Sequence, residues 1–121
     1  MGFTVLVVDD DPGFRRVAGR LLAVRGFEVI GDAADGDQAL TEIRARRPDG
    51  VLLDLNLPDT DGLTLAERIS REPAAPSVVL TSTDMTGYAE RTLAEAGIRA
   101  FVPKDQLVGA DLAGLFTAPG T

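Results

Sequence analysis

The stretch Val51-Leu-Leu-Asp54-Leu-Asn-Leu-Pro58-Asp-Thr-Asp-Gly62 joins an apolar run to a cluster of turn-forming residues. The apolar residues predict a buried strand, and the Pro-Asp-Thr-Asp-Gly cluster cannot continue it. Asp54 therefore stands where a strand ends. In an open α/β sheet, ligands bind outside the carboxyl ends of the strands, so this carboxylate is a candidate site residue. The stretch alone is equally consistent with an Asp that only caps a turn.

Strands and helices are expected to alternate along the whole chain. Apolar, β-branched runs predict strands at residues 4–8, 27–31, 51–54, 77–81 and 99–102. Apolar residues at helical spacing predict helices at residues 12–25, 36–47, 63–71, 85–96 and 106–116. Five such units predict an α/β fold, a doubly wound five-stranded parallel sheet with helices on both faces. A length of 121 residues suits one domain, so we expect residues 1–121 to form a single unit.

Some helix ends and faces can also be predicted. Asp11 is expected to cap the first helix, and Val17 to lie on the buried side of that helix. Thr83 or Asp84 is expected to cap the fourth helix. In the last helix, Val108 is expected to face the core, although two glycines weaken this helix.

The composition excludes several classes of function. The chain has no Cys and no His, which rules out disulfides, thiolate or imidazole metal ligands and Ser-His-Asp catalysis within it. The net charge of -7 argues against a nucleic-acid partner for this chain alone, because such domains carry a basic surface. No apolar run approaches the roughly 20 residues of a membrane span, and the N-terminus lacks signal-peptide features. We therefore expect a cytoplasmic protein without a membrane partner.

Polar residues follow the predicted strands and should converge at one edge of the sheet. They are Asp9 and Asp10, Asp54, Thr81, and Lys104, the only lysine in the chain. Three carboxylates at one point repel each other unless a cation neutralises them, and Mg²⁺ binds carboxylate and phosphate oxygens. The lysine and the hydroxyl group would bind further oxygens. Such a site suits a phosphoryl group, with Asp54 as the nucleophile that forms an acyl phosphate.

The order of these motifs resembles a known family. Val-Val-Asp-Asp-Asp-Pro at residues 7–12, the stretch around Asp54, Leu-Thr81-Ser and Phe101-Val-Pro-Lys104 together resemble the receiver domain of bacterial two-component response regulators. Each piece alone is common, but four pieces in this order are specific. The resemblance covers essentially the whole chain and implies a flavodoxin-like fold with strand order 2-1-3-4-5 and five helices.

The resemblance also implies the role of each site residue. Asp54 would be the phosphoacceptor. Asp10 would bind Mg²⁺ directly, Asp9 directly or through water, and Asp54 and the backbone carbonyl of Asn56 would complete the protein ligands. Thr81 and Lys104 would each bind a phosphoryl oxygen, and Phe101 would act as the aromatic switch.

The implied function is two-component signal transduction. A partner histidine kinase would supply the phosphoryl group, and the phosphorylated face would bind a downstream protein. The chain would be a phosphoacceptor with self-catalysed transfer and not a turnover enzyme, and a homodimer that depends on phosphorylation is left open. Two features depart from the family. Asp105 follows Lys104 where proline is common and could draw the lysine away from the phosphate, and Phe101 lacks the hydroxyl group of the more usual tyrosine.

Four alternatives remain. The chain could be a receiver fragment of a longer DNA-binding transcriptional regulator, or an unphosphorylated interaction module of the same fold. An aspartyl phosphatase also uses Asp and Mg²⁺, but it needs a second Asp two residues after the nucleophile, where this chain has Asn56. A flavodoxin shares the fold, but the three acids at residues 9–11 would repel the phosphate of its cofactor.

Overall fold

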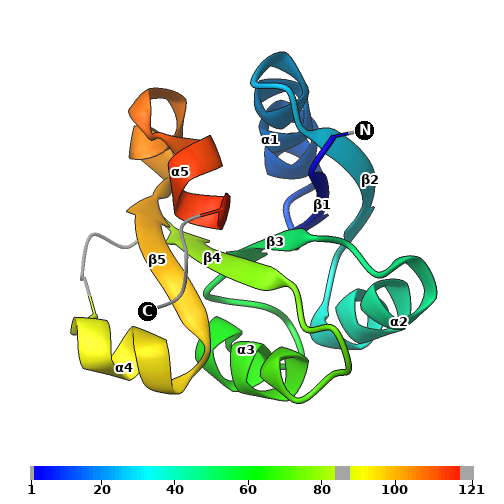
Figure 1. Ribbon diagram of the computed structural model, residues 1–121, viewed down its shortest axis with the longest axis vertical. Helices are drawn as coiled ribbons and strands as arrows, with labels where there is room; N and C mark the ends of the chain where they lie inside the picture. Colours follow the sequence, from blue (N-terminus) through cyan, green and yellow to red (C-terminus); the bar gives the residue numbers. More distant parts are fainter. Residues whose placement is uncertain (1, 84–87, 118–121) are drawn as a thin grey trace.

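The computed structural model describes residues 2–83 and 88–117, and the strands in these residues form one parallel sheet (Figure 1). The strands are β1 (Thr4–Val8), β2 (Glu28–Ala33), β3 (Gly50–Asp54), β4 (Ser77–Ser82) and β5 (Ile98–Pro103). Their order is β2-β1-β3-β4-β5, and every neighbouring pair is parallel. The predicted doubly wound sheet and its strand order are confirmed.

The helices form a layer on each face of the sheet (Figure 1). One layer holds α1 (Pro12–Val24) and α5 (Leu112–Thr117), and the other holds α2 (Gly36–Arg46), α3 (Gly62–Ser70) and α4 (Glu90–Glu95). Alternate strand residues therefore enter different cores. In β1, Leu6 and Val8 pack toward α2, α3 and α4, whereas Val5 and Val7 pack toward α1 and α5. Each fully buried aliphatic side chain contributes about 1.5–3 kcal/mol, so β1 is held from both sides.

Aspartates begin the first three helices. Asp11, Asp35 and Asp61 are the N-caps of α1, α2 and α3, and each carboxylate accepts a hydrogen bond from a backbone amide of the first turn. Such a cap satisfies an amide that the helix leaves unpaired and is worth about 1 kcal/mol. The predicted cap at Asp11 is confirmed. Because α1 and α3 follow β1 and β3 closely, their caps also fix the loops at the carboxyl ends of these strands.

Several local predictions are wrong. Residues 106–116 do not form one helix, because a 3-10 helix, η1 (Lys104–Gly109), ends before α5 begins. A 3-10 helix has three residues per turn, and in η1 Leu107 is buried while Val108 is 70% exposed. Val17 on α1 is also exposed, at 61%, because the buried side of α1 is made by Ala18 and Leu22.

The fourth helix is also shorter than predicted within the described residues. Its expected start at residues 85–87 and the proposed cap Asp84 lie outside them. Helix α4 begins at Glu90 with Ala89 as its N-cap and without a side-chain cap, so Thr83 does not cap it. The predicted end is confirmed, since Gly97 has φ +78°, a left-handed conformation that favours glycine. None of the helices in residues 2–83 and 88–117 has the combined length and apolar character needed to span a bilayer.

Gly62 tests how tightly α3 is joined to β3. A Cβ at this position would lie 2.7 Å from the carbonyl oxygen of Asp54 and 2.9 Å from Cα of Leu55, and these backbone atoms cannot yield without moving the strand end. We expect Gly62→Ala to lower the free energy of unfolding, measured by urea denaturation, by about 1–3 kcal/mol. Gly19→Ala in α1 is the matched control. An added Cβ there meets nothing within 4 Å, so this change should stabilise the protein by about 0.5–1 kcal/mol. Equal effects of the two substitutions would refute this account of Gly62.

Candidate functional site

The predicted site residues lie together at the carboxyl ends of four strands. Asp9 and Asp10 follow β1, Asp54 ends β3, and Lys104 follows β5. Thr81 is the direct partner of Asp54 in the pairing of β4 with β3. The strand order reverses between β1 and β3, and at such a point the connecting loops diverge and leave a crevice. The fold thus brings the polar residues to the place where ligands bind in this architecture.

The three carboxylates form a compact cluster. One oxygen atom from each of Asp9, Asp10 and Asp54 lies within 4.8 Å of the others. Asp9 is fully buried and Asp54 is 5% exposed, whereas Asp10 is exposed. The cluster is therefore closed on the protein side and open to solvent on the other. Oxygen ligands in this arrangement suit a hard divalent cation that keeps some of its water molecules, as Mg²⁺ does.

Lys104 supplies the positive charge. Its Nζ lies 2.6 Å from Asp9 Oδ2 and 3.5 Å from Asp54 Oδ1. Burial opposes protonation, but the hydrogen bond to Asp9 and the charge of Asp54 outweigh it, so the pKa of Lys104 lies above its ordinary value. The expected competition from Asp105 is not observed. In the described part of the chain, both ion pairs of Lys104 are with Asp9 and Asp54, and Asp105 is exposed.

The surroundings of Asp54 disfavour its ionised form. Burial raises the pKa of Asp54 to about 6, and the charge of Asp9 adds to this effect. Lys104 opposes the shift, and Asp10 adds a smaller contribution. A second cation beside these carboxylates would favour the charged form and lower the pKa again. The electrostatics of the cluster therefore fit a bound metal ion.

The hydroxyl group of Thr81 is an unused donor. Thr81 is fully buried, and its Oγ1 has no hydrogen-bond partner among the described residues. Asp9 Oδ2 is also buried, and its charge is compensated by the ammonium group of Lys104 at 2.6 Å. Leaving a buried polar group unpaired costs about 1–3 kcal/mol. Because Thr81 lies beside Asp54, the hydroxyl group is placed to donate to an oxygen of a group attached to Asp54.

Two further predicted residues lie on the strand and the loop that adjoin the site residues. Phe101 in β5 is half-buried, and its ring stands edge-on to the ring of Tyr88 at a centroid distance of 6.2 Å. Asn56 lies in the loop after β3 and forms an isolated antiparallel bridge with Asp61. The roles of Phe101 as a switch and of the Asn56 carbonyl as a metal ligand stay predictions.

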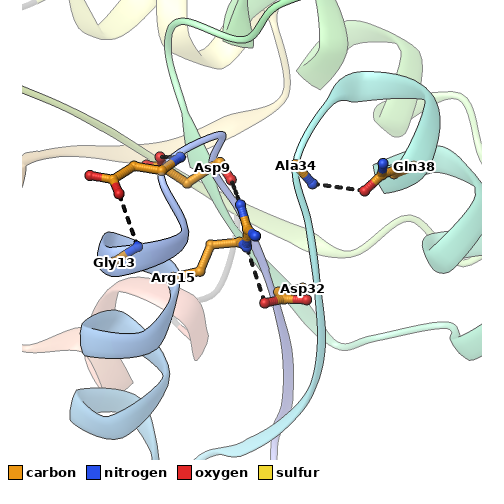
Figure 2. Close-up of polar contacts among 7 residues, drawn as sticks. Asp9, Gly13, Arg15, Asp32, Ala34 and Gln38 are labelled. Atoms are coloured by element: carbon orange, nitrogen blue, oxygen red, sulfur yellow. Dashed lines mark hydrogen bonds and ion pairs between the residues drawn. The ribbon is translucent and has the colours of Figure 1, made fainter.

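Two residues of the site were not anticipated from the sequence. The ring of Phe14 lies under Lys104, with Nζ 4.2 Å from the ring centroid, a cation–π contact that helps hold the ammonium group. In the sequence, Phe14 stands at helical spacing from Ala18 and Leu22, a pattern that indicates a core position and nothing more. Arg15 donates to the backbone carbonyl of Asp9 and to the carboxylate of Asp32 (Figure 2). A cation in the first turn of a helix opposes the helix dipole. This unfavourable placement was the one feature of the sequence that indicated a role for Arg15 outside the helix.

The fold and the site define a flavodoxin-like protein with an acidic cluster at the point where the strand order reverses. The model of the response regulator receiver domain matches residues 5–110. The chain belongs to this family, whose members are signalling modules of two-component systems and bind Mg²⁺ at an acidic pocket.

The chain is similar to segments of longer proteins. It is 38% identical over 104 residues to protein-glutamate methylesterase/protein-glutamine glutaminase 3 of Hahella chejuensis. The match covers 84% of this chain and 30% of that protein. It is 33% identical over 100 residues to the transcriptional regulatory protein PdtaR of Mycobacterium tuberculosis. This second match covers 83% of this chain and 48% of that protein. The chain therefore spans less than half the length of these curated relatives.

A solved structure shows the same fold. The crystal structure of a two-component response regulator of the LuxR family from Aurantimonas sp. SI85-9A1 superposes with a TM-score of 0.82. The sequences are 28% identical, and the match covers 95% of this chain and 86% of that chain. The agreement extends over both layers of helices and supports the family assignment independently of the motifs.

The raised pKa of Asp54 predicts a pH-dependent stability. Without divalent ions, Asp54→Asn should stabilise the protein at neutral pH, by up to about 3 kcal/mol for a pKa shift from 3.8 to about 6, because it removes a costly buried charge. Loss of the contact with Lys104 will reduce this gain. Wild-type stability should fall as pH rises from about 4 to about 6, and the advantage of the variant should vanish below about pH 4, where the carboxyl group is protonated in both states.

Urea denaturation in EDTA across this pH range measures the effect. Asp10→Asn is the control, because Asp10 is exposed and makes the smaller contribution to the pKa of Asp54. Its effect on stability should be smaller than that of Asp54→Asn. A destabilised Asp54→Asn variant at neutral pH, with the same pH dependence as wild type, would contradict the prediction.

Proposed function

We propose that the chain is a receiver that accepts a phosphoryl group on Asp54 from a phosphohistidine of a partner kinase, and that residues 1–121 act as one unit in this reaction. The observation that carries the proposal is the arrangement around Asp54. This carboxylate ends a central strand, lies against Asp9 and Asp10, contacts Lys104 and has the unpartnered Thr81 hydroxyl beside it. Each neighbour has a task in phosphoryl transfer to a carboxylate.

In the proposed reaction, a carboxylate oxygen of Asp54 attacks the phosphorus atom. A bond forms between this oxygen and phosphorus, and the phosphorus–nitrogen bond to the kinase histidine breaks, with the electron pair leaving on the imidazole nitrogen. Lys104 and Thr81 would each bind an oxygen of the transferred group. Most of the catalysis in such transfers comes from positioning and charge stabilisation, which these residues supply without taking part in covalent steps.

The proposed cofactor is Mg²⁺. The carboxylates of Asp9, Asp10 and Asp54 would hold it, and the backbone carbonyl of Asn56 is proposed as the fourth protein ligand. When bound, the ion neutralises charge on the carboxylates and on the phosphoryl oxygens, which would otherwise repel each other. The exposed Asp10 leaves the cluster open on one side, so a phosphorylated side chain of another protein can approach from solvent.

The proposed output is a change in a protein-binding face. Thr81 would move toward the phosphoryl group, and Phe101, on the neighbouring strand, would respond by changing its packing against Tyr88. The partners would be a histidine kinase and a downstream protein in the cytoplasm. Because the curated relatives are longer than this chain, an alternative is that these residues are the receiver part of a larger regulator.

The direct test is phosphorylation by a small donor. The protein is incubated with Mg²⁺ and acetyl phosphate, and intact mass is measured for wild type, Asp54→Asn and Asp105→Asn. We expect one added phosphoryl group on wild type, none on Asp54→Asn, and none on any of the proteins in EDTA. Asp105→Asn is the matched control, because Asp105 is exposed and, in the described chain, makes no ion pair with the neighbouring Lys104. This variant should gain the same phosphoryl group as wild type. Failure of a folded, Mg²⁺-binding wild type to be modified would favour the unphosphorylated interaction module instead.

A further inference from the structure

We propose that Arg15 positions the acidic loop after β1 for the divalent cation, although Arg15 is not itself a ligand. The inference rests on the proposed function, because it concerns the same metal site. It assigns a task to a residue that no part of the phosphoryl-transfer scheme requires. The observations that carry it are the hydrogen bonds of Arg15, the restraints on Asp9 and the location of Arg15 in α1.

The guanidinium group of Arg15 joins two neighbouring strand ends. Its Nη1 donates to the backbone carbonyl of Asp9 at 2.6 Å, and its Nε donates to Asp32 Oδ2 in β2 at 3.1 Å. Figure 2 shows the side chain lying between these two acceptors. The Arg15 side chain is 18% exposed and the Asp32 side chain is 59% exposed, so the contact with Asp9 is the sheltered one. Asp32 acts as an outer anchor for the guanidinium group.

Arg15 completes a set of restraints on Asp9. The backbone amide of Asp9 donates to the carbonyl of Ala33 at 3.0 Å, and Asp9 Oδ1 accepts from the amide of Asp11 at 2.8 Å. The carbonyl group of Asp9 is the third restrained group. This carbonyl belongs to the rigid peptide plane that leads into Asp10, so the bond from Arg15 fixes the orientation at which the exposed ligand Asp10 leaves the strand. Arg15 thereby orders both acids of the loop.

The position of Arg15 in α1 suits the positioning of the loop, although a cation at this position does not stabilise the helix. It is the fourth residue of the helix, near the positive end of the helix dipole, where a cation is disfavoured. Helical side chains point back toward the N-terminus, which directs this one over the loop. A lysine would keep the charge but could not reproduce the planar fork that serves two acceptors in different directions.

Charge and position predict opposite effects on metal affinity. Arg15 is a cation near a proposed cation site, so by Coulomb's law its removal should tighten Mg²⁺ binding. If Arg15 orders the ligands, its removal should weaken binding, since partners that orient metal ligands are typically worth about 10–100-fold in affinity. The sign of the change therefore separates positioning from electrostatics.

The experiment is a calorimetric titration of Mg²⁺ alone into wild type, Arg15→Ala, Arg15→Lys, Asp32→Asn and Arg16→Ala. We expect Arg15→Ala to raise the Kd about tenfold or more, and Arg15→Lys to raise it several-fold although the charge is kept. Asp32→Asn should have a smaller effect, because the bond to the Asp9 carbonyl remains. Arg16→Ala removes the same charge from an exposed neighbour in α1 and should leave the Kd unchanged or slightly lower.

The outcomes separate this inference from the proposed function. If Arg15→Ala binds Mg²⁺ as tightly as Arg16→Ala does, the positioning role is overturned while the proposed function stands. If wild type binds no Mg²⁺, both are overturned. Circular dichroism and urea denaturation establish that each variant is folded. Should Arg15→Ala be unfolded, Arg15→Lys decides the question, and an unchanged Kd in this folded variant would overturn the inference.

Discussion

Mutual repulsion among Asp9, Asp10 and Asp54 is the constraint on which the rest of the site depends. Three carboxylate oxygens lie within 4.8 Å of one another, and two of the side chains are buried, where charges are poorly screened. Within the described residues only Lys104 forms ion pairs with this cluster. The sheet can hold such a cluster because β1 and β3 are adjacent and are packed with apolar side chains on both faces. The core thus supplies the free energy that keeps these acids together.

The loops at the strand ends are restrained by connections between elements. Asp59, in the loop after β3, accepts hydrogen bonds from the backbone amides of Gly36 at 2.8 Å and Asp37 at 3.1 Å, at the start of α2. The bond from Gly36 is the main cause that lowers the pKa of Asp59. Arg15 makes the corresponding connection between the loop after β1 and strand β2. Each acidic loop is therefore tied to an element that is distant in sequence.

The sequence predicted the parallel sheet and the convergence of the site residues, because both follow from local patterns plus the rule that parallel strands end at one edge. The strand order was implied by the resemblance to the receiver family and not by these patterns. It did not predict η1, since a 3-10 helix buries side chains at a period that is close to that of an α-helix over a few residues. The contacts of Arg15 were missed for another reason. Its acceptors are the carbonyl of Asp9, just after β1, and the carboxylate of Asp32 in β2, and no local pattern records which groups a long side chain will reach in the folded chain.

The position of Lys104 links metal binding to phosphoryl transfer under the proposed function. Its ammonium group is closer to Asp9 than to Asp54, at 2.6 Å against 3.5 Å, so in this structure it mainly neutralises Asp9. If Lys104 shifted from Asp9 toward a phosphoryl oxygen on Asp54, the buried carboxylate of Asp9 would lose its counter-charge. A divalent cation at the cluster would remove this obstacle by balancing the charge of Asp9. Under the proposed function, a need for Mg²⁺ would then follow from the geometry of the lysine as well as from the charge of the incoming group.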